Sequence, residues 1–498
     1  MMASLLPLFV VVPLIAAGIA AFARRSHRWS SVLLLATLAA TTIAAGALVA
    51  ATAQGQVVAA ALGGWPGGIA IPFVADVFSA LVMTVAGVLT LVSCWFALVG
   101  GTGRHPLFAS LVLVLIAGVN GALLTADLFN LFVFIEVMLL PSYGLLVIAQ
   151  KGKGTLRSVV GSRLYVTFNL FVSTVFLAGV ALVYGTAGTV NLAELSDAAA
   201  TSDLTAAAVA VCLFALAMKA AVVPVHGWLA RAYPSTSPAV TAMFSALHTK
   251  VAIYAIYRIY AVVFEGDQRW LWIGVVLFSA TMVVGVLGAV GETRIRSILA
   301  FHMVSQIGYI LLGVALFTQL GLAAGIFYLL HHMIVKSSLF LSAAAVETRY
   351  GTDVLADLRN RVGREPLLTV VFGVAALSLA GLPPFSGFFA KLTLITGAVE
   401  AGQITAAIIA LAVSLITLMS MLKIFNAVFA PTVTGSFRNE DHAVVEAPPT
   451  PLHLVAPAAT LAAVTLGLGL GAEGLFDLAT VAAAGLLDTR AYVEAVLP

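Results

Sequence analysis

Long runs of apolar residues alternate with short polar connections along almost the whole chain. A helix needs about 20 apolar residues to cross the roughly 30 Å hydrocarbon core of a bilayer. The pattern therefore predicts an all-α polytopic membrane protein with fourteen transmembrane helices. The predicted spans are 2–23, 31–52, 73–98, 107–126, 128–149, 160–184, 206–232, 238–262, 270–290, 297–317, 320–346, 367–401, 404–430 and 455–478.

Two of these spans are predicted to be interrupted at interior prolines, the seventh at Pro224 and the twelfth at Pro383 and Pro384. Proline removes a helical hydrogen bond, so the backbone here is expected to be broken and to line a cavity or lie buried in protein. Simple kinks, which membrane helices tolerate, are the alternative. When Pro224 is set over Pro384, PVHGWLAR aligns with PFSGFFAK, and Gly227 falls over Gly387.

The two predicted breaks occupy the same place in successive groups of five helices, helices 4–8 and 9–13. Because five is odd, the second group enters the membrane from the opposite side, which predicts the inverted repeat of many secondary transporters. Helices 7 and 12 are the broken members. The expected regions are 1–106 (three N-terminal helices), 107–262 (first repeat), 263–430 (second repeat) and 431–498 (an amphipathic linker and helix 14).

The distribution of Lys and Arg predicts the orientation, because cytoplasmic connections carry an excess of positive charge. With the N-terminus outside, only Arg269 and Arg490 fall outside, which predicts both termini outside and a multi-pass protein of the cell membrane. The cations assigned to the cytoplasmic side or its interface are Arg24, Arg25, Arg28, Arg104, Lys151, Lys153, Arg157, Arg163, Arg231, Arg294, Arg296, Arg349, Arg359, Arg361, Arg364 and Arg438.

Composition agrees with a lipid environment and excludes several classes of protein. Of the 498 residues, 62% are hydrophobic and 9% are charged, against about 25% charged in soluble domains. A soluble enzyme, a disordered chain and a nucleic-acid-binding protein are excluded on this balance. The two cysteines, Cys94 and Cys212, cannot build a disulfide framework or an iron–sulfur site. No Walker motif and no His, Cys and carboxylate cluster at ligand spacing occurs, so we expect no cofactor and no metal.

A few charged residues lie inside the predicted spans, where each costs roughly 2.5–3.5 kcal/mol on insertion scales and usually marks function. Arg258 and Lys423 lie near span ends, where their side chains can reach the interface. The remaining five are expected at similar depth, in a row running in the membrane plane. They are Glu136, Lys219, Lys250, Lys336 and Lys391, on helices 5, 7, 8, 11 and 12.

Histidines accompany this row. His332 and Lys336 are four residues apart and share a helix face, and His331 is adjacent. Histidine exchanges protons near neutral pH, and a buried lysine can do so too. His226, His248, His302 and His331 are further relay candidates, with hydrogen-bonded packing groups as the alternative. Glu136 and Lys219 are candidates for a proton relay or for a permanent ion pair between helices 5 and 7.

Five segments resemble the proton-translocating antiporter-like subunits shared by respiratory complex I and Mrp-type antiporters. The resemblance covers nearly the whole chain and is strongest over 70–430, and FNLFVFIEVMLL and AFHMVSQIGYI look most like the D-type member of the Mrp antiporter. The segments are DLFNLFVFIEVMLLPSYGLLV (Asp127–Val147), MKAAVVPVHGWLARAYPSTSPAVTAMFSALHTKVAIYAIYR (Met218–Arg258), RIRSILAFHMVSQIGYI (Arg294–Ile310), HHMIVKSSLFL (His331–Leu341) and GLPPFSGFFAK (Gly381–Lys391).

The resemblance implies a role for each residue of the row. Glu136 and Lys219 match the glutamate and lysine of the first half-channel, and Lys250 matches the bridging lysine. His332 and Lys336 match the central relay, and Lys391 the terminal lysine. A complex I pattern often has histidine where Gln306 stands, and His302 replaces a small polar residue, so the link between the half-channels departs from that pattern.

The resemblance also implies the function and the partners. We expect a secondary transporter subunit, not an enzyme, that relays protons in a multisubunit Na⁺ (monovalent cation)/H⁺ antiporter. Its partners would be the other antiporter subunits, including a larger A-type and a small C-type subunit. The alternatives are a proton-pumping subunit of NADH:quinone oxidoreductase or of a membrane-bound hydrogenase, and a structural membrane scaffold with a degenerate relay.

Overall fold

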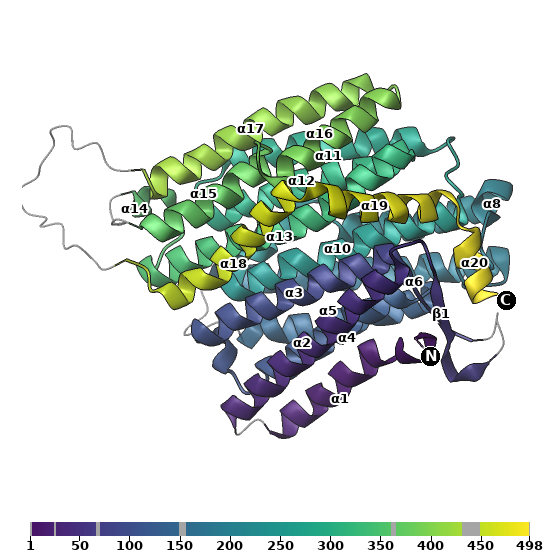
Figure 1. Ribbon diagram of the computed structural model, residues 1–498, viewed down its shortest axis with the longest axis horizontal. Helices are drawn as coiled ribbons and strands as arrows, with labels where there is room; N and C mark the ends of the chain where they lie inside the picture. The colour runs from purple at the N-terminus through teal and green to yellow at the C-terminus, as the bar shows by residue number, and fades with distance from the viewer. Residues whose placement is uncertain are drawn as a thin grey trace, which may run out of the picture.

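The computed structural model describes residues 2–23, 26–65, 70–148, 156–359, 365–430 and 449–497. Most of these residues are helical (Figure 1). The helices are α1 (Leu8–Phe22), α2 (His27–Thr52), α3 (Val77–Val99), α4 (Phe108–Leu124), α5 (Leu128–Ile148), α6 (Leu156–Ala187), α7 (Ala198–Thr201), α8 (Asp203–Lys219), α9 (Gly227–Ala232), α10 (Pro238–Val263), α11 (Leu271–Gly291), α12 (Ile295–Leu316), α13 (Gln319–Tyr350), α14 (Leu355–Leu358), α15 (Pro366–Ala380), α16 (Ser386–Glu400), α17 (Ile404–Val428), α18 (Leu452–Leu470), α19 (Ala472–Leu487) and α20 (Arg490–Val496).

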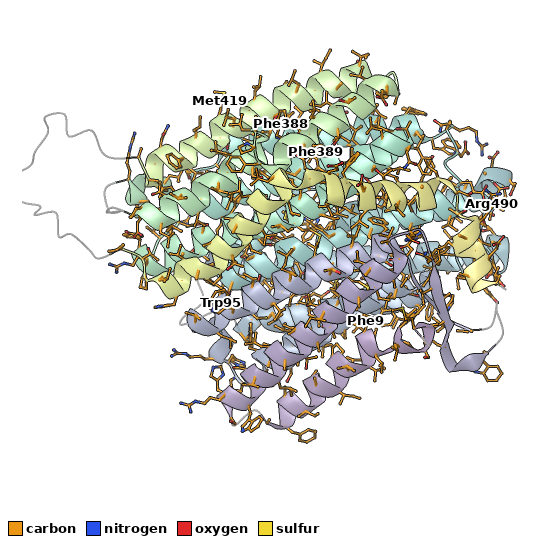
Figure 2. All side chains as sticks on the ribbon, viewed as in Figure 1. Phe9, Trp95, Phe388, Phe389, Met419 and Arg490 are labelled. Carbon is orange, nitrogen blue, oxygen red and sulfur yellow. The ribbon has the colours of Figure 1, made fainter. Side chains whose placement is uncertain are left out.

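The helices form a bundle suited to a bilayer. Within the described residues, 11 helices are long and apolar enough to cross a membrane, and α4 and α15 are shorter apolar helices. Large apolar side chains point outward; Met419 on α17 is 68% exposed and projects from the bundle (Figure 2). Figure 1 shows both chain termini at the same end of the helices, as an even number of crossings requires.

Two helices form the centre of the bundle. In the most apolar 18-residue stretch of α10, and in that of α13, every residue is buried. In the most apolar stretch of α5 only 44% of the residues are buried. Helix α13 packs against α3, α10, α12, α15, α16, α18 and α19. Polar side chains on α10 and α13 therefore face protein and not lipid.

Both predicted interruptions are present. The chain leaves helix between α8 and α9, and again between α15 and α16. Ala221 and Gly381 open the two breaks with positive φ angles of 64° and 88°. The backbone hydrogen bonds also match, counting from Pro224 and Pro384. They are Ala221 N to Met218 O (3.0 Å), Val222 N to Ala217 O (3.0 Å) and Val225 N to Val222 O (3.0 Å) in the first break, and Gly381 N to Ser378 O (3.1 Å), Leu382 N to Leu377 O (3.1 Å) and Phe385 N to Leu382 O (3.1 Å) in the second.

A second packing motif also occurs twice. Two glycines three residues apart on α4 let the backbone of α5 approach closely, and two glycines with the same spacing on α11 do the same for α12. Small residues allow such close approach in membrane bundles. A Cβ added to these glycines would lie 2.6 Å from Met138 N (Gly118), 2.3 Å from Phe134 Cδ1 (Gly121), 2.3 Å from Ser305 N (Gly285) and 2.2 Å from Phe301 Cδ1 (Gly288).

The structure departs from the sequence-based fold in two places. First, β1 (Val58–Ala61) and β2 (Pro72–Ala75) form an antiparallel hairpin, so the expectation of an all-α chain is wrong in this detail. Second, the predicted span 455–478 is divided between α18 and α19 at Gly471. A Cβ at nearby Gly469 would lie 2.4 Å from Pro384 O, so this junction packs directly on the second break. Residues 431–448 of the predicted linker lie outside the described residues.

Candidate functional site

Three residues from three helices form a first group beside the break after α8. Lys219, the last residue of α8, is 1% exposed, and its Nζ donates to Asn169 Oδ1 on α6 at 3.4 Å. Glu136 on α5 interacts electrostatically with Lys219. Glu136 Oε1 is buried, and no described residue gives it a hydrogen bond or an ion pair within 4.0 Å. The candidate ion pair between Glu136 and Lys219 is therefore not closed in this structure.

His248 on α10 joins this first group. Its Nε2 lies 2.7 Å from Ser142 Oγ on α5, and it interacts electrostatically with Lys219. His226, in contrast, lies in the break itself, is only partly buried and contacts the Phe301 ring at a centroid distance of 6.4 Å. The structure therefore places His248 in the group and His226 in the break, against Phe301 of α12.

A second group begins on the opposite face of α10. Lys250 is 1% exposed, and its Nζ donates to Thr249 Oγ1 at 3.1 Å. It interacts electrostatically with Lys336 and His332 on α13. Lys336 Nζ and both ring nitrogens of His332 are buried without a hydrogen-bond partner among the described residues. Buried polar groups of native proteins have a protein or water partner, so we expect water to reach this place.

The second break contains the far end of this group. Lys391 Nζ on α16 donates to Ala380 O at 2.9 Å and to Ser414 Oγ on α17 at 2.9 Å. His331 interacts electrostatically with Lys391, and its Nδ1 lies 2.8 Å from Ser386 Oγ at the start of α16. The helix break thus supplies both a free carbonyl for the lysine and a hydroxyl for the histidine.

His302 on α12 connects the centre with this end. It interacts electrostatically with Lys336 and Lys391, and its Nε2 lies 2.9 Å from Ser420 Oγ on α17. Gln306, one turn further along α12, accepts a hydrogen bond from the Tyr328 hydroxyl. Both departures from the complex I pattern, His302 and Gln306, therefore lie within the second group.

The row consists of two groups with α10 between them. His248 and Lys250 are two residues apart, about 200° around a helix, so they face opposite sides of α10. His248 interacts electrostatically with Lys219 in the first group, and Lys250 interacts with His332 and Lys336 in the second. A proton that travels the whole row must therefore pass α10.

Asn169 was not predicted from the sequence, although it is the side chain that contacts Lys219. A signal was present: Tyr165 and Asn169 are four residues apart on α6, like Tyr328 and His332 on α13. The tyrosines have similar surroundings. Tyr165 meets His248 edge-on at a ring-centroid distance of 6.1 Å, and Tyr328 meets His331 edge-on at 5.7 Å. In this comparison Asn169 takes the place of His332.

The two cations expected at span ends have specific partners. Arg258 is 2% exposed and pairs with Asp76, the residue that caps the start of α3, at 2.5 Å. Lys423 donates to the carbonyls of Val290 (2.9 Å) and Glu292 (2.6 Å) at the end of α11. Cations at a helix C-terminus satisfy free carbonyls, and neither residue lies in the row.

The aligned glycines of the two breaks, Gly227 and Gly387, differ in their surroundings. A Cβ at Gly387 would lie 1.7 Å from Ser378 O, whereas a Cβ at Gly227 has nothing within 4 Å. We expect Gly387→Ala to displace α16 and greatly reduce the yield of assembled protein, and Gly227→Ala to leave the yield unchanged. Size-exclusion chromatography of the two purified variants checks this; equal yields would contradict the packing described for Gly387.

Chemically, the arrangement contains a carboxylate, four lysines and several histidines, all groups that bind and release protons. In the described part of the chain, no three His, Cys, Asp or Glu side chains are grouped so as to hold a metal ion. The site is therefore suited to moving protons through a protein interior.

Comparisons with known proteins identify the family to which the chain is similar. The family model described as NADH:quinone oxidoreductase/Mrp antiporter, TM, matches residues 125–417. The chain is 38% identical to the D-type component of the Na⁺/H⁺ antiporter of Alkalihalophilus pseudofirmus, over 88% of this chain and 87% of that protein. It is similar to a chain of the Mrp complex from Dietzia sp. DQ12-45-1b (TM-score 0.95, 52% identity, 100% of both chains). It is also similar to a chain of an archaeal membrane-bound sulfane sulfur reductase (TM-score 0.88, 25% identity, 99% of both chains).

Proposed function

Because this chain belongs to the NADH:quinone oxidoreductase/Mrp antiporter membrane family, we propose that it is the proton-translocating D-type subunit of a multisubunit monovalent-cation/proton antiporter. Proton motive force would drive the export of Na⁺ or a similar cation. The observation that carries the proposal is the buried row itself, in which Glu136, His332 and Lys336 have side-chain atoms without hydrogen-bond partners among the described residues. A purely structural row would be expected to close its ion pairs.

The proton would travel in steps between the groups. It would enter at Glu136 and pass to Lys219, which Asn169 holds in place. His248 and Lys250 would carry it across α10, and His332 and Lys336 would receive it on α13. His302 and Lys391 would form the last steps, with His331 and Ser386 beside the second break.

We propose that the chain contains two inverted repeats, 107–262 and 263–430. The first group then lies in the first repeat, and the second group lies in the second repeat except for Lys250 on α10, which belongs to the first. The repeated glycine packing of α4 on α5 and of α11 on α12 supports this assignment, as do the matching hydrogen bonds in the breaks. The fourteen-helix count follows if α8–α9, α15–α16 and α18–α19 each cross the membrane once. Both termini would then lie on the same side of the membrane, and the distribution of Lys and Arg favours the outside.

The partners we propose are the other subunits of the antiporter, including a larger A-type and a small C-type subunit. Two relatives support this proposal. The protein of Alkalihalophilus pseudofirmus is named as a component of an antiporter, and the chain from Dietzia sp. is part of an Mrp complex. The similarity to the sulfane sulfur reductase supports the alternative of a redox-driven pump.

One experiment separates these two functions. The complete complex is placed in proteoliposomes with a pH-sensitive dye, a Na⁺ gradient is imposed, and no electron donor is added. Under these conditions an antiporter moves protons in the direction opposite to Na⁺, whereas a redox-driven pump moves no protons. Proton movement that requires an electron donor would contradict the antiporter.

Asn169 is expected to position Lys219 in the first group. Asn169→Leu removes the acceptor of Lys219, and because hydrogen bonds to charged groups contribute about 1.5–3 kcal/mol, we expect proton flux per assembled complex to fall about tenfold or more. Asn120→Leu is the matched control, since Asn120 is also buried but donates to Phe9 O, away from the row. Equal fluxes for the two variants would contradict a positioning role for Asn169.

A further inference from the structure

An apolar groove with a volume of about 740 Å³ lies between α8 and α11. Ala206, Ala210 and Phe214 on α8 form one wall, Leu277 on α11 forms the other, and Tyr260 on α10 lies at the base. The groove faces outward, because Phe214 is 55% exposed and Leu277 is 36% exposed. Its volume is within the 300–1,000 Å³ typical of sites for small molecules.

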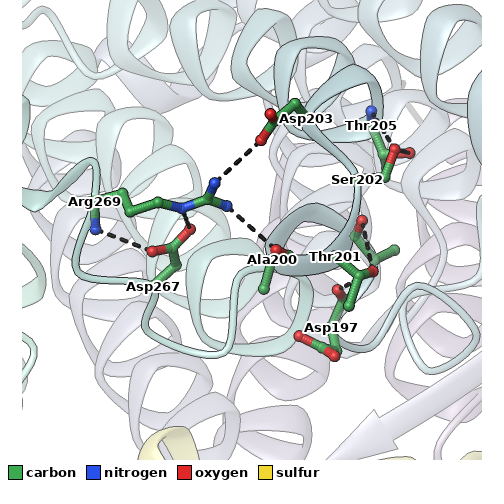
Figure 3. Close-up of polar contacts among 9 residues, drawn as sticks. Asp197, Ala200, Thr201, Ser202, Asp203, Thr205, Asp267 and Arg269 are labelled. Carbon is green, nitrogen blue, oxygen red and sulfur yellow. Dashed lines mark hydrogen bonds and ion pairs between the residues drawn. The ribbon is translucent and has the colours of Figure 1, made fainter.

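One end of the groove is charged. Figure 3 shows the Arg269 guanidinium between Asp203 and Asp267, with bonds of 3.1 Å and 2.7 Å to their carboxylates and 3.2 Å to Ala200 O. Burial raises the pKa of Asp267, but hydrogen bonds from the Arg269 backbone and guanidinium lower it, and the net direction is downward. Asp203 and Arg269 keep exposed side-chain surface, 84% and 49%. This end therefore presents a positive and a negative group side by side.

Exposed tryptophans near Arg269 indicate that the charged end lies at the height of lipid headgroups. Trp270 and Trp272, which are 41% and 63% exposed, adjoin Arg269, and tryptophan gathers at the membrane–water interface. From Asp203 to Ala217, α8 rises about 21 Å. The apolar part of the groove is thus long enough for a chain that crosses one leaflet, about 15 Å.

We propose that this groove binds one phospholipid with a zwitterionic ethanolamine headgroup. An acyl chain would lie along α8 between Ala210 and Leu277, the phosphate would contact Arg269, and the ammonium would donate to Asp203. The charges favour this lipid over an anionic one, because two carboxylates flank the single guanidinium and a further negative charge would meet repulsion.

The bound lipid would support the helix break that holds Lys219. The groove extends to Ala217, two residues before that lysine. On its other wall, Thr281 lies one turn beyond Leu277, and its Oγ1 accepts a hydrogen bond of 3.1 Å from Val223 N within the break. An acyl chain between α8 and α11 would therefore fill the space beside Ala217 and Thr281, which adjoin the break from the two helices.

Photocrosslinking tests this proposal on the complete complex. The complex is placed in vesicles of phosphatidylethanolamine and phosphatidylglycerol that contain a phosphatidylethanolamine with a diazirine on its acyl chain, and the labelled peptides are identified by mass spectrometry. We expect labelling of α8 and α11 residues of the groove. Ala210→Trp, which fills the groove, should remove this label, whereas Leu411→Trp on the exposed face of α17 should not.

The headgroup is tested separately. Arg269→Gln should weaken labelling by the ethanolamine lipid about tenfold, whereas Arg490→Gln, which removes an exposed arginine from a similar pair with Asp488, should not. No groove label in the wild-type complex, or equal label in Ala210→Trp, would overturn the lipid site. A phosphatidylglycerol probe that labels the groove equally well would overturn the choice of headgroup. Groove residues that crosslink to a partner subunit instead of to lipid would overturn the lipid as the occupant of the groove.

Discussion

Replacement of Lys336 by methionine is expected to abolish Na⁺-dependent proton flux while the complex still assembles. Lys336 interacts electrostatically with Lys250 on one side and with His302 on the other, so it is the connection through the second group. Its Nζ has no hydrogen-bond partner among the described residues, and the Phe340 ring lies 5.5 Å away. Methionine fills the space without the charge, and because burying an unpaired charge is costly, its removal should not destabilise the fold.

The expected loss of flux is about 100-fold or more, the usual effect of removing a group that transfers protons. The measurement is the initial rate of the Na⁺-induced pH change per assembled complex. Lys423→Met is the control, because Lys423 contacts carbonyls at the end of α11 and lies outside the row. A Lys336→Met complex with a rate within about twofold of wild type would contradict the role of Lys336.

The second large effect concerns stability. Arg258→Leu should destabilise the protein by about 3–5 kcal/mol, because it leaves the Asp76 carboxylate without its buried partner. Asp76 also caps α3 through Ser79, and Arg258 lies over the Tyr492 ring of α20 at 4.7 Å. The pair therefore joins α3, α10 and the C-terminal helix.

A double variant separates the pair from simple loss of packing. In Asp76→Asn combined with Arg258→Leu no unpaired charge remains, so the double variant should be more stable than Arg258→Leu alone. Thermal unfolding of the purified complexes gives the comparison. A double variant that unfolds at a lower temperature than Arg258→Leu would show that the ion pair is not what makes the single change costly.

The helix breaks could be located from sequence because their prolines lie in two segments that match each other. Proline alone does not mark a break, since α1, α5 and α18 continue through Pro13, Pro141 and Pro457. The match of PVHGWLAR with PFSGFFAK placed Gly227 and Gly387 at equivalent positions, and the backbone around the breaks agrees with it. Their surroundings differ, however, because only Gly387 packs against a neighbouring backbone carbonyl. A short alignment records residue type and not the distance to the next helix.

Long-range partners could not be predicted in the same way. Asp76 and Arg258 are far apart in the chain, and a carboxylate before one span carries no sign of an arginine in another. The depth of Lys219 and Lys250 in the membrane could be predicted from their distance to the ends of their helices. The separation of the row into two groups by α10 could not, because it depends on the direction in which each side chain points. Asn169 shows the reverse case, because its four-residue spacing from Tyr165 is visible in the sequence and equals that of His332 from Tyr328.

The most direct test of proton transfer along the row is Na⁺-driven proton flux in vesicles that hold the complete complex, with Glu136→Ala and Lys219→Ala measured beside wild type. Both residues belong to the first group, where Glu136 has a buried oxygen without a partner among the described residues and Lys219 lies at the break. Each variant is expected to assemble and to lose flux. Wild-type flux in either variant would contradict proton transfer along the row.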